Sequence, residues 1–480
     1  SVASSPDGIA LVHGDLEMSY GDLDARSTRL AHYLVSKGIK KEELIPICVD
    51  RSLEMIISVL GVLKSGAAYV PIDPSYPLDR ITFILQDTSA NFIITKSDNP
   101  ILDLVSGCEF FCVDRDWEEV NSFSSEKLDL GIMPNNLANV IYTSGTTGKP
   151  KGVLCEHRGV VNLAQNMIDI TGMDNAVKML QFSSFSFDAF SFELFSTMIC
   201  GGQLILTDKS TINSLDKIRP LINSKEINIA LLPPSYQEAL KDDLGTITTI
   251  ISGGEALNYN LTKEFQSKGI KVFNAYGPTE NTVCSSVSSA PIIENKVTIG
   301  SPIGNTKIYI LDQSENLVPF GTPGELCVSG VQVARGYLNR PSLTSEKFVK
   351  NPYGSGNYDR LYKTGDLARW LPDGQIEYLG RIDRQVKLRG YRIELGEIEN
   401  TIKTVFEEIQ HGIVEMKEIN GDKVLVGYLV LKSEIDLSII KPALLEKLPD
   451  YMVPSYYVAL SSLPLTSNGK IDRSVLPIPS

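Results

Sequence analysis

Short apolar runs alternate with longer amphipathic segments along most of this chain, and this alternation restricts the fold more than any other feature. Residues 44–49 read Leu-Ile-Pro-Ile-Cys-Val, a pattern typical of a buried strand, and residues 52–64 place Met55, Ile56 and Val59 at helical spacing. Further strands are predicted over residues 92–95, 140–143, 203–207, 229–232 and 249–252. Because strands that are joined through helices pair in parallel, the sequence predicts an α/β fold with parallel-rich sheets.

Beyond Gly300 the pattern changes from parallel to antiparallel signals. Turn residues separate short strands predicted over residues 307–311, 324–329 and 375–378. A smaller unit begins near residue 384, with helical periodicity over residues 394–405. Residues 412–418 and 423–431 then flank an Asn-Gly pair, which is typical of a tight β-hairpin.

The charge balance limits the classes of partner. Lys and Arg total 45 against 58 Asp and Glu, so the net charge of -13 repels polyanions, and we expect neither nucleic-acid nor membrane binding. Apolar stretches such as residues 198–206 are far shorter than the roughly 18 residues of a membrane-spanning helix. An anionic ligand therefore needs a local site.

Cysteine and histidine usage favours a reducing compartment and no zinc. The seven cysteines are scattered without a CxxC pair, as expected for a cytoplasmic protein of this size. The four histidines show no metal-ligand spacing. His157 follows a glycine-rich loop but has no evident chemical partner, so we expect it to be structural.

Residues 142–152, Tyr-Thr-Ser-Gly-Thr-Thr-Gly-Lys-Pro-Lys-Gly, have the composition of a phosphate cradle. Glycines allow close backbone approach to an anion, hydroxyls donate hydrogen bonds and lysines supply charge. The residues concerned are Thr143, Ser144, Gly145, Thr146, Thr147, Gly148, Lys149 and Lys151. The run is not a P-loop, which needs a glycine where Thr143 stands and a hydroxyl where Pro150 stands. On composition alone, a flexible polar turn is the alternative.

Other motifs favour the phosphate cradle over the flexible polar turn. This run resembles a signature of the AMP-forming adenylating superfamily of acyl-CoA synthetases, luciferases and peptide-synthetase adenylation domains, and the order and spacing of four other motifs also match. These motifs are NAYGPTE at 274–280, YKTGD at 362–366, GRIDRQVKLRG at 380–390 and LTSNGK at 465–470. Finer features are similar to nonribosomal peptide synthetase adenylation domains: residues 63–77, FDA at 187–189, GELCVSG at 324–330 and ARGYLNRP at 334–341. The resemblance covers almost the whole chain.

The resemblance implies a fold and a domain division. A large N-terminal core, residues 1–382, combines parallel-rich sheets and helices with a small barrel-like subdomain, and a small mobile α+β domain, residues 383–480, follows it. The core is expected to bind ATP and an amino acid. Asp383 matches the hinge, and Lys387 lies in the loop that lines the thiol tunnel.

The implied reaction joins an amino-acid carboxylate to the α-phosphorus of ATP and releases pyrophosphate. An α-carboxyl has a pKa of about 3.3–3.7, so it is already ionised and no general base is needed. Two anions must meet, and catalysis should therefore come from positioning and charge neutralisation. The implied cofactors are ATP and Mg²⁺.

The resemblance also assigns roles to the nucleotide-site residues. Lys470 bridges the substrate carboxylate and the α-phosphate, Glu280 helps to bind Mg²⁺, and Thr279 contacts phosphate. Asp366 takes the ribose hydroxyls, Arg381 supports the nucleotide and Tyr276 lies against adenine. Further residues expected around the nucleotide are Gly253, Gly254, Glu255, Asn274, Ala275, Gly277 and Tyr378.

A second half-reaction follows from the same resemblance. The small domain rotates so that the phosphopantetheine thiol of a carrier protein can attack the adenylate. No carrier motif occurs within these 480 residues, so condensation and carrier domains of a parent synthetase are expected as neighbours. Such synthetases make antibiotics or other secondary metabolites.

Alignment through the FDA and NAY motifs places the specificity pocket. Its positions are Asp188, Ala189, Phe192, Leu231, Ile251, Gly253, Ala275, Val283, Cys284 and Lys470. A buried carboxylate is costly without a partner, so Asp188 predicts a substrate with an α-ammonium group. Apolar walls with small Gly253 and Ala275 favour phenylalanine, then tryptophan, tyrosine or leucine.

Three alternatives remain open from the sequence. An acyl-CoA synthetase shares the ATP motifs but has no need of an acid at Asp188. A D-alanyl carrier-protein ligase is closer chemically but needs a smaller pocket. A nucleotide-binding scaffold without turnover is opposed by the presence of Lys470, Glu280 and Asp366.

Overall fold

The computed structural model describes residues 5–104, 106–145, 149–293, 296–464 and 471–479. The chain divides into two compact units. The large unit comprises Ser1–Pro74, Leu85–Tyr142 and Gly152–Ile382, and the small unit comprises Ser75–Ile84, Thr143–Lys151 and Asp383–Ser480. The two short segments grouped with the small unit have no counterpart in the sequence-based division at Asp383.

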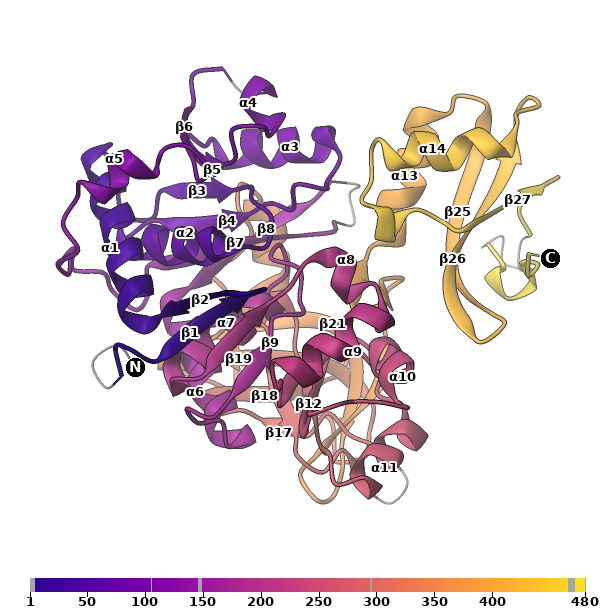
Figure 1. Ribbon diagram of the computed structural model, residues 1–480. Coiled ribbons are helices and arrows are strands. Elements are labelled where there is room, and N and C mark those ends of the chain that lie inside the picture. Colours follow the sequence, from indigo (N-terminus) through magenta and orange to yellow (C-terminus); the bar gives the residue numbers. More distant parts are fainter. Residues whose placement is uncertain (1–4, 105, 146–148, 294–295, 465–470, 480) are drawn as a thin grey trace. The chain divides into compact units, whose positions relative to one another are not determined.

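The first sheet of the large unit has the order β6-β5-β3-β4-β7-β8. The pairs β3–β4, β3–β5, β4–β7 and β5–β6 are parallel. The strands are β3 (Leu44–Ile47), β4 (Ala68–Pro71), β5 (Phe92–Thr95), β6 (Glu109–Cys112), β7 (Leu137–Thr143) and β8 (Lys151–Glu156). Nearby in sequence are helices α1 (Tyr20–Ser36), α2 (Leu53–Lys64), α3 (Leu78–Thr88), α4 (Ile101–Leu104), α5 (Trp117–Asn121) and α6 (His157–Thr171) (Figure 1).

The helix predicted over residues 52–64 forms α2. Ser52 starts it as an N-cap, because its Oγ accepts a hydrogen bond from the backbone N–H of Met55. A β-carbon at Gly61 would lie 2.7 Å from Leu30 Cδ2 of α1, so glycine at this position lets the two helices pack closely.

The second sheet has the order β17-β14-β13-β12-β11-β9-β10-β1-β2, and its middle is parallel as predicted. The strands are β1 (Ile9–His13), β2 (Leu16–Ser19), β9 (Lys178–Leu180), β10 (Gln203–Leu206), β11 (Ile229–Leu232), β12 (Thr249–Ser252), β13 (Lys271–Tyr276), β14 (Ser286–Ser288) and β17 (Ser301–Pro302). Between them run α7 (Ala189–Cys200), α8 (Lys209–Ile212), α9 (Leu215–Ser224), α10 (Pro234–Leu240), α11 (Tyr259–Ser267) and η1 (Thr279–Asn281). β15 (Ile292–Ile293) and β16 (Lys296–Val297) pair with each other.

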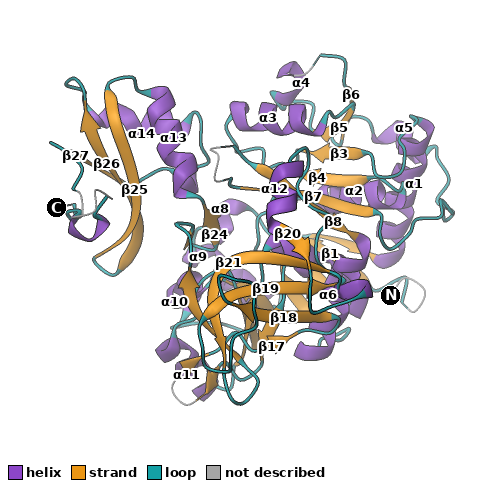
Figure 2. Cartoon of the chain, turned by 180° about the vertical axis from the view of Figure 1, so that it is seen from behind, coloured by secondary structure: helices purple, strands orange, loops and turns teal. Residues whose placement is uncertain are grey.

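The antiparallel region predicted beyond Gly300 is confirmed. β18 (Thr306–Leu311), β19 (Gly324–Gly330), β21 (Arg360–Trp370) and β20 (Phe348–Lys350) pair in that order, and β22 (Ile376–Arg381) also pairs with β21 (Figure 2). α12 (Pro341–Lys347) and η2 (Gly356–Tyr358) interrupt them. The last strand runs three residues past the predicted end at 378, because Gly380, with a φ of +119°, stays inside the strand rather than ending it.

In the small unit, β25 (Ile409–Ile419), β26 (Asp422–Leu431) and β27 (Tyr456–Leu460) form one sheet, and β23 (Val386–Leu388) and β24 (Tyr391–Ile393) form a separate pair. Helices α13 (Leu395–Val405) and α14 (Ile440–Leu445) accompany η3 (Leu437–Ile439), η4 (Asp450–Met452) and η5 (Arg473–Val475). Asn420 and Gly421 have φ of 53° and 87°, which confirms the predicted Asn-Gly hairpin.

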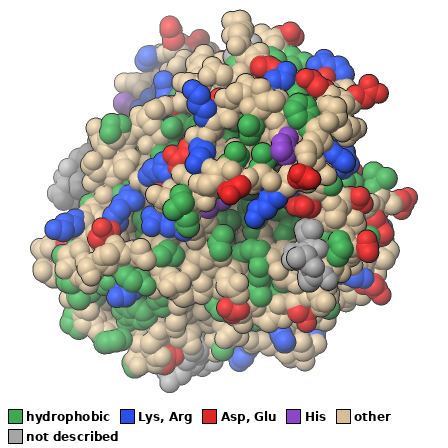
Figure 3. Space-filling model, turned by 90° about the vertical axis from the view of Figure 1, so that its left-hand side faces the viewer, with side chains coloured by type: hydrophobic (Ala, Val, Ile, Leu, Met, Phe, Trp, Pro, Cys, Tyr) green, Lys and Arg blue, Asp and Glu red, His purple; other side chains and the backbone are tan. Residues whose placement is uncertain are grey.

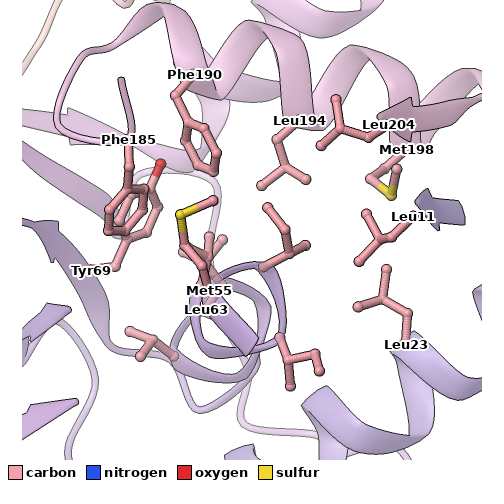
Figure 4. Close-up of a cluster of buried hydrophobic side chains, with 14 of the residues drawn as sticks. Leu11, Leu23, Met55, Leu63, Tyr69, Phe185, Phe190, Leu194, Met198 and Leu204 are labelled. Carbon is pink, nitrogen blue, oxygen red and sulfur yellow. The ribbon is translucent and has the colours of Figure 1, made fainter. Parts of the chain in front are cut away.

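The main core of the large unit lies between the helices and the two parallel sheets. Figure 4 shows part of it, where the rings of Tyr69 and Phe185 stack with centroids 6.3 Å apart and Phe190 meets Phe185 edge-on. Leu11, Met55 and Leu204 belong to the same buried cluster. Within the described residues, no helix is both long and apolar enough to cross a bilayer.

Candidate functional site

A buried carboxylate held by two partners forms the centre of the predicted nucleotide site. Asp366 on β21 is 2% exposed, and Tyr276, the last residue of β13, donates its hydroxyl to Asp366 Oδ2 at 2.5 Å. Arg381, at the end of β22, donates from Nη1 to Asp366 Oδ1 at 3.0 Å and to the carbonyl of Thr364 at 2.9 Å. The strand register sets Arg381 opposite Asp366. The structure thus brings together three predicted residues from three strands.

The protonation states in this group follow from burial. Burial raises the pKa of Tyr276 well above its usual value, and the Asp366 charge raises it further, so the hydroxyl remains a donor. The Tyr378 ring lies 6.0 Å from that of Tyr276 at 41°. The result is a hydrogen-bonded carboxyl acceptor beside two aromatic rings.

The predicted metal residue is also buried. Glu280 in η1 is fully buried, and Tyr337 donates its hydroxyl to Glu280 Oε1 at 2.8 Å. The described residues hold no group of three or more His, Cys, Asp or Glu side chains that could bind a metal together. A single carboxylate of this kind fits Mg²⁺, which usually takes one or two protein carboxylates and completes its shell with water and substrate phosphates. Thr279 is adjacent and 8% exposed.

The loop predicted to hold phosphate belongs to the small unit and contacts a carboxylate of the same unit. The backbone N–H of Gly145 donates to Glu397 Oε2 at 3.1 Å, and Arg80 pairs with Glu397 Oε1 at the same distance. The hydroxyl of Ser144 donates to the carbonyl of Arg392 at 2.9 Å. Thr143 Oγ1 is buried without a hydrogen-bond partner within the described residues. An N–H that donates to a carboxylate and a buried hydroxyl without a partner are both suited to an anionic ligand.

The two lysines of this loop, Lys149 and Lys151, have other surroundings than Ser144 and Gly145. Lys149 Nζ lies 5.9 Å from the centre of the Phe83 ring, and Lys151 is 7% exposed. Thr146, Thr147 and Gly148 lie outside the described residues. A β-carbon at Gly145 would come 2.1 Å from the carbonyl of Lys149, so only glycine fits at position 145.

The remaining residues that we predict around the nucleotide lie on β13 and in the segments that follow β12 and β13. Gly253 and Gly254 follow β12, and Glu255 Oε2 accepts the backbone N–H of Ser235 at 3.0 Å. Asn274 donates from Nδ2 to the carbonyl of Thr298 at 2.7 Å, which ties β13 to a neighbouring segment. A β-carbon at Gly277 would lie 2.4 Å from the carbonyl of Val283, so this glycine allows two backbone segments to pass closely.

The predicted specificity residues gather at the carboxyl ends of parallel strands, which is where ligands bind in open α/β sheets. Leu231 on β11 and Ile251 on β12 are direct neighbours in register, and Ala275 lies near the end of β13. Phe192 on α7 belongs to the same buried cluster as Ile251 and Cys284, and Leu231, Ala275 and Val283 pack against that cluster. The structure therefore places six of the predicted residues in one apolar group.

Asp188 and Ala189 stand at the start of α7. The side chain of Asp188 does not cap this helix. Burial raises the pKa of the Cys284 thiol to about 12, and the Asp188 charge is among the lesser causes of this increase. Burial also raises the pKa of Cys155, and here Asp188 is the second cause. Asp188 is therefore close enough to Cys284, one member of the apolar group, to affect this thiol electrostatically.

One wall of this group is strained, which the sequence did not indicate. Thr282 and Val283, both β-branched, have φ of 47° and 72°, in the left-handed region that such residues avoid. Gln332, 1% exposed, donates from Nε2 to the carbonyls of Asn281, Thr282 and Cys284. It also accepts the Thr282 hydroxyl on its own carbonyl at 2.7 Å. No local sequence pattern marks such a clamp.

Of the remaining predicted residues, Asp383 and Lys387 belong to the small unit and His157 to the large unit. Asp383 begins the main segment of the small unit and accepts the backbone N–H of Gln385 at 3.1 Å, and Lys387 lies on β23. Lys470 is outside the described residues. His157, the first residue of α6, has a buried Nε2 with no hydrogen-bond partner among the described residues, and burial lowers its pKa.

A family model and several synthetases match this chain. A model described as AMP-binding enzyme matches residues 1–338. Bacitracin synthase 3 of Bacillus licheniformis is 44% identical over 485 residues, covering 99% of this chain and 8% of that protein. Tyrocidine synthase 1 of Brevibacillus parabrevis is 40% identical over 482 residues, covering 99% of this chain and 44% of that protein. The chain thus spans less than half the length of either relative.

Solved structures agree with these matches. The structure of holo-AB3403, described as a four domain nonribosomal peptide synthetase bound to AMP and glycine, aligns with a TM-score of 0.70 at 32% identity, covering 99% of this chain and 35% of that chain. The structure of holo-PA1221, described as containing adenylation and PCP domains, aligns with a TM-score of 0.85 at 26% identity, covering 98% and 82%.

Proposed function

Because the chain belongs to the AMP-binding enzyme family and is an AMP-forming adenylation domain of the nonribosomal peptide synthetase type, we propose that its substrate is an apolar, preferably aromatic, α-amino acid. The amino acid is activated as its adenylate and then passed to the phosphopantetheine thiol of a carrier protein. The observation that carries the proposal is the position of Asp188 beside the buried apolar group at the ends of β11, β12 and β13.

The nucleotide side of the proposal rests on Asp366. Its carboxylate, fixed by Tyr276 and Arg381, is a preorganised acceptor for two adjacent ribose hydroxyls, with Tyr378 beside it. Gly145 and Thr143 would donate to phosphate oxygens, and Glu280 would hold Mg²⁺. When bound, this ion neutralises charge on the phosphates.

The amino-acid side rests on charge and size. The Asp188 carboxylate would pair with the substrate ammonium, and Phe192, Leu231 and Ile251 would surround the side chain. Carboxylate attack on the α-phosphorus then forms the acyl phosphate bond, and the bond to pyrophosphate breaks. Lys470 is proposed to bridge the two reacting anions.

The transfer step is supported by the relatives. The solved neighbour holo-PA1221 is described as an adenylation and PCP protein. In this chain, a thiolate would attack the adenylate carbonyl carbon to form a thioester, and AMP would leave with the electrons of the broken acyl–oxygen bond. Asp383 is proposed as the hinge and Lys387 as part of the thiol tunnel.

Pyrophosphate exchange with MgATP across the proteinogenic amino acids, a benzoate and a fatty acid tests the proposal. We expect exchange to be strongest with aromatic amino acids and to disappear in Lys470→Ala. Exchange only with acids that lack an amine would refute the role of Asp188, and strongest exchange with alanine would refute the large pocket.

A further inference from the structure

The segment that leads to Asp188 is irregular backbone, and the side chains of Arg51 and Glu193 hydrogen-bond to it. β9 ends at Leu180 and α7 begins at Ala189, so residues 181–188 form no sheet ladder of their own. Buried backbone groups in such a segment need partners from elsewhere. Here the partners are Arg51 and Glu193.

Arg51 satisfies the carbonyl side of the segment. Its Nη1 donates to the backbone carbonyl and to Oε1 of Gln181, both at 2.7 Å. Its Nη2 donates to the carbonyls of Phe182 at 2.7 Å and Ser183 at 2.9 Å. One planar guanidinium thus fixes three successive peptide groups, a geometry that a lysine ammonium cannot reproduce.

Glu193 accepts the backbone N–H groups of Phe182 and Ser183 and also the side-chain amide of Gln181. Ser183 donates to Glu193 Oε1 from its backbone N–H at 2.9 Å and from its hydroxyl at 2.8 Å. Phe182 donates from its backbone N–H at 3.3 Å, and Gln181 donates from Nε2 to Oε2 at 3.0 Å. Glu193 is fully buried on α7, five residues after Asp188.

The middle of the segment is fixed by packing. Phe185 stacks on Tyr69 and meets Phe190 edge-on (Figure 4). The Tyr69 hydroxyl, in turn, lies 3.0 Å from Ser191 Oγ on α7. The segment from Gln181 to Asp188 is therefore held at its start by Arg51 and Glu193, in its middle by the packing of Phe185 and at its end by α7.

We propose that Arg51 and Glu193 are positioning residues that set the place of the Asp188 carboxylate and thereby the affinity for the substrate's α-ammonium group. Neither residue is proposed to touch the substrate. The inference rests on the proposed function, since it takes Asp188 as the ammonium partner. Loss of either clamp lets the segment shift, and displacement of a substrate-binding group by about 1 Å can cost up to ~100-fold in rate.

The test compares two substrates, phenylalanine and its deaminated analogue 3-phenylpropionate, in pyrophosphate exchange by the full chain. The variants are Glu193→Gln, Arg51→Lys, Arg51→Met and the milder Ser183→Ala, which removes one donor to Glu193. Thr262→Val is the matched control, because it also removes a hydroxyl from a fully buried helix position, on α11.

We expect Glu193→Gln and Arg51→Met to raise the KM for phenylalanine about tenfold, with the KM for ATP changed less than about twofold. The KM for 3-phenylpropionate should stay within about twofold, since it has no ammonium group to misplace. Arg51→Lys should recover part of the loss, and Ser183→Ala should show a smaller effect in the same direction. Thr262→Val should leave all three KM values unchanged.

The variant Asp188→Ala distinguishes a failure of the proposed ammonium site from a failure of the proposed positioning role. If this variant does not raise the KM for phenylalanine, the proposed ammonium site is wrong. If it does, but the clamp variants raise the KM for both acids equally or for neither, the positioning role of Arg51 and Glu193 is wrong. If Glu193→Gln and Arg51→Met do not fold, Ser183→Ala decides, because equal KM changes for both acids in that variant overturn the inference.

Discussion

Glu193 should make the stability of the large unit depend on pH. Burial raises its pKa from 4.5 to about 7, although the donors of Ser183 and Gln181 and the charge of Arg51 oppose the increase. The folded protein therefore binds this proton more tightly than the unfolded chain does. Its contribution to stability is complete below about pH 4.5 and is lost as the pH rises through 7.

The size of the effect follows from that shift. A difference of one pKa unit corresponds to about 1.4 kcal/mol. The full difference between 4.5 and about 7 therefore contributes about 3 kcal/mol to the free energy of unfolding. Between pH 5.5 and 8.5 the expected loss is about 2 kcal/mol in the free energy of unfolding. Glu193→Gln removes the titrating group, and this part of the pH dependence should disappear with it.

Urea unfolding at these two pH values, followed by tryptophan fluorescence, measures the effect. Trp117 and Trp370 are the two tryptophans of the chain, and both belong to the large unit. The wild type should lose about 2 kcal/mol more than Glu193→Gln between pH 5.5 and 8.5. Equal pH dependence in the two proteins would show that Glu193 does not take up a proton on folding. Thr262→Val should keep the wild-type dependence.

Three further outcomes follow from the site. Tyr276→Phe removes a hydrogen bond to the buried Asp366 carboxylate. In pyrophosphate exchange, the KM for ATP should therefore rise about tenfold while the KM for the amino acid stays unchanged. An unchanged KM for ATP would contradict the assignment of Asp366 to the nucleotide site. Gln332→Leu frees the strained Val283 wall, so the preference among aromatic amino acids should broaden, and unchanged selectivity contradicts the role of the clamp. Gly277→Ala should yield little folded protein by thermal melting, because its β-carbon would overlap the Val283 carbonyl, and a melting temperature equal to the wild type's contradicts this.

Sequence patterns predicted much of the architecture because the relevant forces are local. Strand 249–252 and the Asn-Gly turn at Asn420 depend on side-chain alternation and on backbone freedom that the residues themselves supply. The parallel-to-antiparallel change near Gly300 follows from turn spacing. The order of strands is different, since the position of β9 between β10 and β11 depends on long-range packing.

Site residues that belong to recognised motifs could be predicted from the sequence. Features that depend on distant contacts or on strained backbone could not. The grouping of Tyr276, Asp366 and Arg381 followed from recognised motifs. The clamp on residues 181–183 did not, because Arg51 reaches Gln181 across 130 positions of sequence. Nor did the left-handed φ of Val283, because β-branched residues normally avoid it and distant contacts such as those of Gln332 with the neighbouring carbonyls hold this segment.

The face of the molecule in Figure 3 carries charged side chains of both signs. On the face shown in Figure 3, lysine and arginine side chains are interspersed with acidic ones rather than forming one continuous basic field. Recognition of an anionic nucleotide is therefore proposed to depend on local hydrogen-bond donors such as the Gly145 N–H, because the net charge of -13 repels anions.

The most direct test of the account is the ratio of kcat/KM for phenylalanine to that for 3-phenylpropionate in pyrophosphate exchange, measured in the wild type and in Asp188→Ala. A desolvated charge pair is worth roughly 3 kcal/mol, so the wild type should favour the amino acid by about 100-fold and the variant should lose most of that preference. Equal ratios in the two proteins would contradict the assignment of Asp188 as the ammonium partner.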